Sequence, residues 1–335
     1  MTARRPRPKP PAPGPREFRA ALERLDARPP TLGRDAEREE IFLRIGGFFE
    51  QNIREGGPWD LKRDGAVWEI VERRLQRAVE DARRADRQSG RIVAWQLYND
   101  GVVLRAGGVT IGLDVVVLPR AFGWPEPPGL ADELADLLDV LFVTHGHEDH
   151  FDPSLVRCCL RRGKPVLLPG PLARDVGPGP NLHAVSNDWR IDLRGLEIVA
   201  REGCHVWRET AAELPLAYFE IACPGGFRFI FGGDVDYTRG FESTPGRRID
   251  LLFLPWRSPN ERFEDGHEAQ IGTTLDAARI ALERVAPAAL MYEHLAEFEH
   301  VYNGFPASYD IAVNLKRRLP VPSELLFWGE KIALR

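Results

Sequence analysis

The sequence predicts an α+β protein in which a helical N-terminal region precedes a strand-rich domain. Apolar residues recur at helical spacing up to about residue 90. From residue 91 the period changes to that of strands, which are separated by turn residues such as Asn99-Asp100-Gly101. A long helical stretch over about 272–285 and a buried strand over 288–294 follow.

The N-terminal region divides into a tail and a helical extension. Residues 1–16 contain five basic residues, six prolines and no acid, so we expect a disordered basic tail. Residues 17–90 carry apolar stripes such as Phe18, Leu22 and Leu25, which predict helices. These helices either pack on the main domain, residues 91–335, or join a second subunit in a homo-oligomer.

Composition narrows the class of protein. The chain is 43% hydrophobic and 28% charged, with a net charge of -5, which favours a globular protein and argues against a nucleic-acid partner. No apolar run is long enough to predict a membrane span. The four cysteines do not form a disulfide framework, which favours a reducing, cytoplasmic location.

The expected strands and turns of the main domain show where its polar residues lie relative to the ends of the strands. A hairpin is expected over 92–106, a buried strand over 139–144, and a short helix from Pro153 with Asp152 as its N-cap. Further expected strands cover 109–117, 165–168, 196–201, 217–222, 227–232 and 250–254.

The stretch THGHEDHFD, residues 144–152, lies between the buried strand and the short helix. His145 and His147 are two positions apart, so they point the same way in an extended segment. Asp149 and His150 then turn into the helix and face the same hollow. Imidazoles with a carboxylate suit zinc, and also manganese or iron, so this turn predicts a metal site.

Three downstream residues are candidates for the remaining ligands. His205, Asp234 and His294 each follow a predicted strand. Because all three stand where a strand becomes a loop, we expect them to converge on one rim of a sheet sandwich.

On these residues the sequence resembles the metallo-β-lactamase superfamily over about residues 92–300. The match rests on the motif H-x-H-x-D-H followed by the three downstream residues in the same order: His145, His147, Asp149 and His150, then His205, Asp234 and His294. The resemblance implies a four-layer αββα sandwich with a dinuclear metal site.

The same resemblance implies ligand roles and a mechanism. His145, His147 and His205 would hold the first metal ion. Asp149, His150 and His294 would hold the second, and Asp234 would bridge the two ions. Two divalent ions, with zinc as the first candidate, would hold a hydroxide between them. This hydroxide would attack an ester, lactone, amide or phosphodiester bond of a small molecule. Asp149 would also orient this nucleophile.

Within the superfamily, the sequence looks most similar to the branch of ascorbate-6-phosphate lactonase and N-acyl-phosphatidylethanolamine phospholipase D. The shared features are the Pro-rich loop at 119–128 and His267, a candidate to bind substrate or donate a proton. The residues after His294, LAEF, depart from the Gly-Thr-Phe-like phrase of that branch. Asp114 is a candidate to orient a metal ligand.

Three other functions stay open. A nuclease of the same superfamily would use the basic tail to bind RNA. A non-catalytic scaffold would use the helical extension for assembly. A di-iron oxidoreductase would need an electron-carrier partner.

Overall fold

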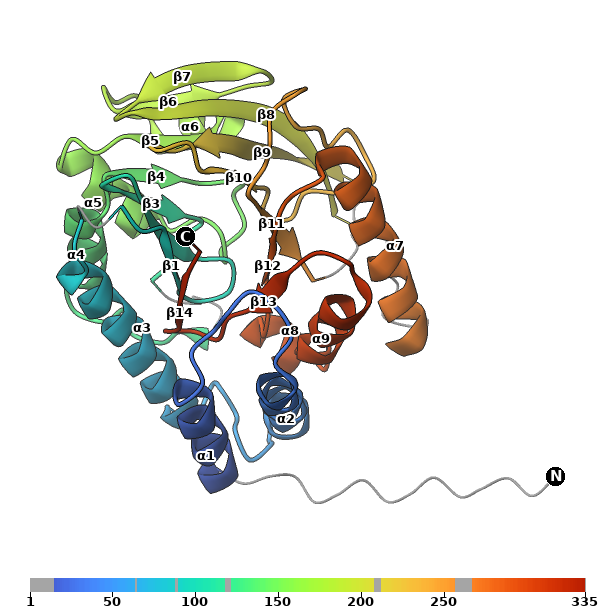
Figure 1. Cartoon of the computed structure of the whole chain (residues 1–335). Coiled ribbons are helices and arrows are strands. Elements are labelled where there is room, and N and C mark those ends of the chain that lie inside the picture. Colours follow the sequence, from blue (N-terminus) through green and yellow to red (C-terminus); the bar gives the residue numbers. More distant parts are fainter. Residues whose placement is uncertain are drawn as a thin grey trace.

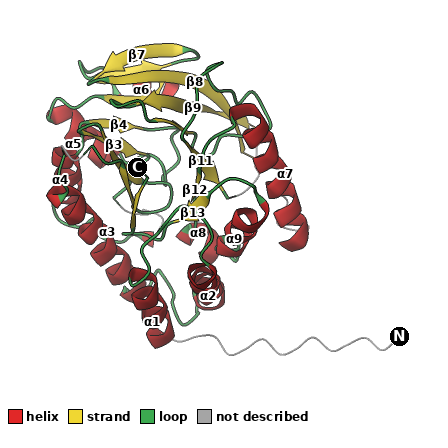
Figure 2. Cartoon of the chain, viewed as in Figure 1, coloured by secondary structure: helices red, strands yellow, loops and turns green. Residues whose placement is uncertain are grey.

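The computed structural model describes residues 15–63, 65–87, 90–117, 122–207, 212–256 and 267–334. Within them, two sheets of seven strands each face one another, and helices cover the outer faces (Figures 1 and 2). This is the αββα sandwich that the sequence predicts. None of the described helices is long and apolar enough to cross a membrane.

The first sheet has the strand order β14-β1-β2-β3-β4-β5-β6. Its first four strands pair antiparallel, and from β3 to β6 all neighbours are parallel. The strands of this sheet are β1 (Val93–Gln96), β2 (Val102–Ala106), β3 (Val109–Leu113), β4 (Val140–Phe142), β5 (Val166–Pro169), β6 (Leu182–Val185) and β14 (Lys331–Ala333).

The second sheet has the order β13-β12-β11-β10-β9-β8-β7 and mirrors the first. Strands β7 to β10 pair antiparallel, and β10 to β13 pair parallel. The strands of this sheet are β7 (Trp189–Leu193), β8 (Leu196–Trp207), β9 (Ala212–Ala222), β10 (Arg228–Phe231), β11 (Leu251–Pro255), β12 (Leu290–Glu293) and β13 (Ser323–Leu325).

Alternate residues of the central strands divide between two apolar clusters. Val140 and Phe142 of β4 face the second sheet, whereas Leu141 between them faces the helices. The ring centroids of Phe142 and Phe219 lie 5.0 Å apart across the two sheets. Strands buried on both faces need apolar residues at every position, which explains the continuous apolar runs in the sequence.

The helices lie outside the sheets. Helices α3, α4 and α5 cover the first sheet, and α7 and α9 cover the second (Figure 1). The helices are α1 (Pro15–Asp26), α2 (Ala36–Asn52), α3 (Ala66–Arg84), α4 (Leu130–Leu137), α5 (Pro153–Arg161), α6 (Gly170–Val176), α7 (His267–Val285), α8 (Phe298–Tyr302) and α9 (Tyr309–Arg318).

Helices α1 to α3 belong to the same apolar cluster as the helices that cover the sheets. Phe18 of α1 stacks on Phe48 of α2 at 4.6 Å between ring centroids, and Phe49 stacks on Trp328 at 5.8 Å. Residues 1–14 of the expected tail lie outside the described residues, and residues 15 and 16 begin α1. The boundaries at residues 16 and 90 stay predictions.

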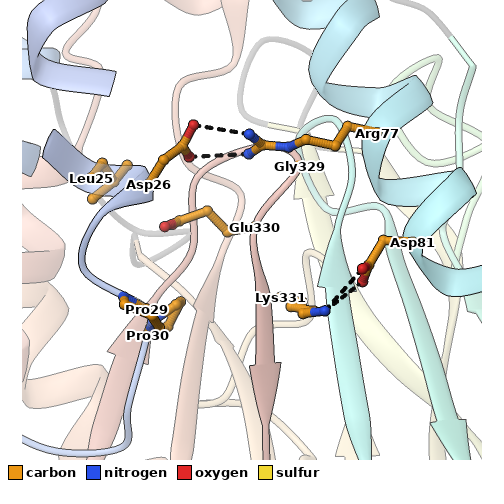
Figure 3. A pocket seen from close by; sticks show the side chains of 9 residues that line it. All are labelled: Leu25, Asp26, Pro29, Pro30, Arg77, Asp81, Gly329, Glu330 and Lys331. Atoms are coloured by element: carbon orange, nitrogen blue, oxygen red, sulfur yellow. Dashed lines mark hydrogen bonds and ion pairs between the residues drawn. The ribbon is translucent and has the colours of Figure 1, made fainter. Parts of the chain in front are cut away.

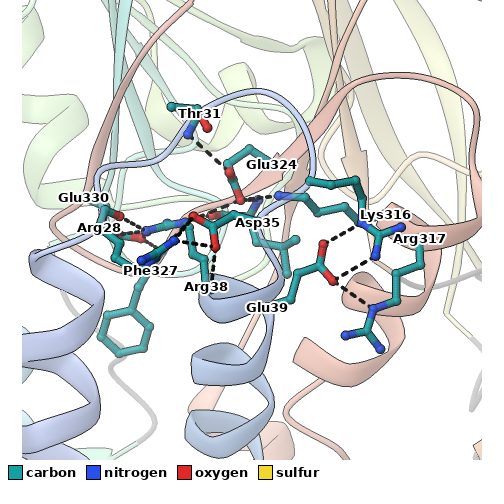
Figure 4. Close-up of polar contacts among 12 residues, drawn as sticks. Arg28, Thr31, Asp35, Arg38, Glu39, Lys316, Arg317, Glu324, Phe327 and Glu330 are labelled. Carbon is teal, nitrogen blue, oxygen red and sulfur yellow. Dashed lines mark hydrogen bonds and ion pairs between the residues drawn. The ribbon is translucent and has the colours of Figure 1, made fainter.

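A buried ionic network ties α2 to the C-terminal strands (Figure 4). Arg38 donates to both carboxylate oxygens of Glu330, at 2.8 and 2.6 Å. Lys316 of α9 donates to Glu324 of β13 at 2.7 Å. Because Arg38 is 1% exposed, its charge has little access to water and depends on these partners.

A cavity of about 230 Å³ lies between α1, α3 and β14 (Figure 3). Asp26 accepts hydrogen bonds from Arg77 at 2.9 and 3.0 Å, and Lys331 donates to Asp81 at 2.8 and 2.9 Å. These ion pairs join the first helix, the third helix and the last strand at the surface.

Candidate metal centre

The predicted site residues gather at one rim of the sandwich. Asp114 follows β3, the segment 145–150 follows β4, Asp234 follows β10 and His294 follows β12. Parallel strands end at the same edge of their sheet, so each sheet presents its residues to the common rim.

His205 differs from the prediction in its local structure. The expected strand at 196–201 continues to Trp207 as β8, so His205 lies within the strand instead of after it. It pairs with Leu214 of β9 in an unbroken antiparallel register. Because β8 and β10 are both antiparallel to β9, they run in the same direction, and His205 still lies near the end of β8 at the rim.

Backbone hydrogen bonds fold the segment 144–152 into a turn. The amides of His150 and Phe151 both donate to the carbonyl oxygen of His147, at 3.1 and 2.9 Å. Asp152 caps α5, as predicted, by accepting from the amides of Ser154 and Leu155 at 2.8 and 3.2 Å. These bonds hold the turn against the first turn of the helix.

Three groups of possible ligand atoms result among the described residues, of which two contain the seven predicted ligands and the third joins Asp114 to His145 and His150. The first group contains one side-chain atom from each of His145, His147, His205 and Asp234, all within 4.8 Å of one another. In it, Nε2 of His145 lies 2.9 Å from Nδ1 of His147.

The second group contains Asp149, His150 and His294, again within 4.8 Å. Oδ2 of Asp149 lies 3.3 Å from Nε2 of His150 and 3.3 Å from Nε2 of His294. The structure thus brings together all seven residues that the sequence nominates as metal ligands.

The carboxylate of Asp234 lies between the two groups. Its Oδ2 atom is 3.6 Å from Nε2 of His205 and 3.8 Å from Nε2 of both His145 and His150. Its Oδ1 atom is 3.1 Å from Nε2 of His294. One side chain therefore faces imidazoles of both groups.

The donor set fits divalent cations. Nε2 of His150 and Nε2 of His294 are buried, and although carboxylate oxygens lie 3.1 to 3.8 Å away, neither atom makes a hydrogen bond to a described residue. Leaving buried polar atoms without hydrogen bonds is costly, and ligation of a cation would remove that cost. Imidazole nitrogens with carboxylate oxygens form a borderline ligand set that suits zinc, manganese and iron.

The pKa values of Asp234, His145 and His294 are shifted because buried, charged side chains lie close together in the centre. Burial raises the pKa of Asp234, but the facing imidazoles of His294 and His150 outweigh burial and hold that pKa well below its usual range. Burial, reinforced by His150, lowers the pKa of His145 well below its usual range. Burial lowers the pKa of His294, but Asp234 and Asp149 outweigh it and raise that pKa.

A layer of carboxylates lies behind the imidazoles. Asp114 lies 2.7 Å from Nδ1 of His150 and accepts from the amide of Thr144 at 2.7 Å, in line with the orienting role predicted for it. A Cβ at Gly233, where φ is 51°, would lie 2.5 Å from Oγ1 of Thr144 and 3.0 Å from Asp114. Glycine at position 233 therefore leaves room for the Thr144–Asp114 pair.

Sequence reasoning did not single out the site-facing roles of Asn99, Asp100, Glu293 and Glu297. Burial raises the pKa of Asp100 to about 7, although His150 opposes it. Burial and the nearby Asp100 raise the pKa of Glu293 well above its usual range. Glu297 lies 3.5 Å from Nδ1 of His294, whose φ of 64° is rare outside glycine. The only signal for them in the sequence is that each lies in a turn or within three residues of a predicted ligand.

The remaining predicted site residue is His267. It is the first residue of α7, so the helix begins earlier than the expected residue 272. Its side chain lies outside what the structure describes, and its role stays a prediction.

Comparison with known proteins supports the fold. No family model matches the chain, and no curated protein matches it in sequence. Among solved structures, Igni18, a metallo hydrolase from Ignicoccus hospitalis KIN4/I, matches at a TM-score of 0.50 and 15% identity, covering 72% of this chain and 97% of that one. The fold is the metallo-β-lactamase sandwich that the sequence predicts.

A second solved structure is CmlA, a diiron beta-hydroxylase from Streptomyces venezuelae. It matches at a TM-score of 0.51 and 17% identity, and the match covers 73% of this chain. The matched part spans 54% of the length of CmlA.

Proposed function

We propose that this protein is a metal-dependent hydrolase with a dinuclear centre. In this proposal His145, His147 and His205 hold one cation, and Asp149, His150 and His294 hold the other. The observation that carries the proposal is the position of Asp234. Because its two oxygens face imidazoles of both groups, 3.1 to 3.8 Å away, a single carboxylate can contact both cations.

Bound divalent cations would supply Lewis acidity and would lower the pKa of water towards neutrality. Asp149 is the residue proposed to orient the attacking water and to hold its proton. Its side chain is 18% exposed, against 6% for Asp234 and 0% for Asp114. Asp149 is therefore the carboxylate among these three that a solvent molecule reaches most easily.

The proposed cations are zinc ions, with manganese and iron as alternatives. The proposed substrate is a small molecule with an ester, lactone, amide or phosphodiester bond, as in the branch of ascorbate-6-phosphate lactonase and N-acyl-phosphatidylethanolamine phospholipase D. His267 is proposed to bind substrate or to donate a proton to the leaving group. A cytoplasmic location completes the proposal, together with assembly into a homo-oligomer through the outer surfaces of α1 to α3, since their apolar faces pack on the main domain.

A di-iron oxidoreductase is the second candidate. The observation that favours it is the similarity in fold to CmlA, a diiron beta-hydroxylase. Imidazole and carboxylate ligands serve iron as well as zinc. The two candidates differ in the metal retained on purification and in whether dioxygen is consumed.

Elemental analysis of the purified protein, run beside a panel of lactone, phosphodiester and β-lactam substrates, tests the proposal. We expect about two equivalents of zinc per chain and turnover of at least one substrate class. The variant Asp149→Ala should lose that turnover. Asp276→Ala, on the exposed face of α7 with a side chain 74% exposed, is the matched control and should keep it.

Three outcomes contradict the proposal. If the wild-type protein binds no divalent metal, it has no dinuclear centre. Full activity in Asp149→Ala removes the proposed role of that residue. Iron in place of zinc, with dioxygen consumption and no hydrolysis, favours the oxidoreductase.

A further inference from the structure

The tip of the β1–β2 hairpin points into the metal centre. The amide of Leu97 donates to the carbonyl of Gly101 at 2.7 Å, and the amide of Gly101 donates to the carbonyl of Tyr98 at 2.8 Å. Asn99 has a φ of 49°, a conformation that asparagine adopts more readily than most residues. The side chain of Gln96 donates to the carbonyl of Asn99 at 2.6 Å and stiffens the turn.

Both side chains at this tip contact residues of the H-x-H-x-D-H motif. Nδ2 of Asn99 donates to Oδ2 of Asp149 at 2.7 Å. The same oxygen faces Nε2 of His150 and of His294, each at 3.3 Å. Oδ2 of Asp100 lies 3.3 Å from Nδ1 of His150, on the far side of that ring. Consecutive residues of one turn thus meet two consecutive ligand candidates.

Burial shows that these contacts are not those of an ordinary turn. Asn99 is 2% exposed and Asp100 is 0% exposed, although Asn-Asp turns normally lie in water. Both oxygens of Asp100 lack a hydrogen bond to any described residue, so its burial is costly by itself. The chain contains a second Asn-Asp turn, Asn187-Asp188, and both of its residues are exposed.

We propose that Asn99 and Asp100 are positioning residues for the metal centre. Asn99 fixes the rotation of the Asp149 carboxylate. Asp114 is hydrogen-bonded to Nδ1 of His150, and Asp100 places a second carboxylate 3.3 Å from the same atom. This inference rests on the proposed function, since it assigns ligand roles to Asp149 and His150. It places the recognition of the second cation partly in a hairpin about 50 residues before the motif.

Binding of cobalt(II) to metal-free protein tests the inference, because its visible absorption reports ligand geometry. In Asn99→Gly the positive φ is tolerated and only the amide is lost. Asp100→Asn keeps the side-chain volume and removes the charge. We expect each variant to bind the second cobalt ion about 10- to 100-fold more weakly than wild type and to shift the absorption bands.

Two controls separate positioning from general damage. Asn187→Gly removes the same residue type from the exposed Asn-Asp turn and should leave cobalt affinity and spectrum unchanged. Far-UV circular dichroism of each metal-free variant should match wild type, which shows that the fold is kept.

The outcomes distinguish this inference from the proposed function. Wild-type protein that binds no cobalt overturns the proposed function and, with it, the inference. Wild-type protein that binds two ions, with unchanged affinity and spectrum in both Asn99→Gly and Asp100→Asn, overturns only the positioning role. Weaker binding together with an equal loss in Asn187→Gly also overturns it.

Discussion

Oδ1 of Asp234 lies 3.1 Å from Nε2 of His294, and this contact joins two strands of the second sheet at the rim of the sandwich. Asp234 follows β10 and His294 follows β12, with β11 between them. The parallel register of these three strands brings the two side chains to one level. The rest of the candidate centre depends on the same alignment of strand ends.

Asp234→Asn should lower metal content from about two ions per chain to one or fewer. The amide keeps the shape of the side chain but removes the negative charge that faces both groups of imidazoles. Turnover should fall at least 100-fold. Elemental analysis and initial rates on the same preparations measure both effects, and two fully bound ions in Asp234→Asn would contradict the prediction.

Removal of metal by a chelator should lower the Tm by roughly 5 °C or more. A ligand present at about 100 times its Kd stabilises the folded state by about 2.7 kcal/mol. Differential scanning calorimetry before and after dialysis measures the shift, and added zinc should restore it. An unchanged Tm on removal of two bound ions would contradict a structural contribution of the metal.

The same stabilisation should weaken as pH falls. Burial lowers the pKa of His150 and of His294, but the nearby carboxylates outweigh burial and raise both pKa values in the metal-free protein. Binding of a cation must displace these protons, so protons compete with the metal at low pH. Titration of zinc affinity from pH 8 to pH 5 should show a steady loss, with proton release on binding.

Arg38→Met should lower the free energy of unfolding by about 3–5 kcal/mol, because it leaves the buried carboxylate of Glu330 without its hydrogen-bonded cation. Glu330 lies 2.6 Å from Arg38, and Glu324 lies 3.6 Å from it. Arg44→Met on the exposed face of α2 is the control, since that side chain is 60% exposed, and should change stability by less than about 0.5 kcal/mol. Urea denaturation measures both, and equal losses would contradict the prediction.

Asp26→Asn should destabilise the protein at neutral pH but not in acid. Burial raises the pKa of Asp26, but hydrogen bonds from Arg77 and Arg74 outweigh burial and leave that pKa lowered. A lowered pKa contributes stability above the ordinary value of 3.8 and loses it as pH falls through the folded value. The difference from wild type, about 1 kcal/mol at pH 7 for a half-buried pair, should therefore vanish at low pH in urea titrations.

Much of the centre could be predicted because its residues stand beside strong local signals. The turn from 145 to 150 lies between a buried strand and a capped helix, and both elements are found. Asp234 and His294 follow apolar runs that form β10 and β12. These positions depend on local pattern and on strand direction, which the sequence carries.

The rest depends on tertiary pairing that no local pattern encodes. The sequence predicts the end of a strand at Arg201, Glu202 and Gly203. Pairing with β9 instead extends β8 to Trp207. Strands β13 and β14 have three residues each, too few for a recognisable period. The Asn99-Asp100 turn was predicted as a turn, but it is buried against Asp149 and His150, which lie about 50 residues further along the chain.

The pairing of Arg38 with Glu330 has a consequence for how the chain is made. The two residues are 292 positions apart, so a ribosome needs roughly 15–60 s to reach the second after the first. During that time the nascent helix α2 exposes a cation and an apolar face whose partners do not yet exist. The N-terminal helices must therefore wait until residue 330 has been made, and a product that stalls before it would leave them exposed to chaperones.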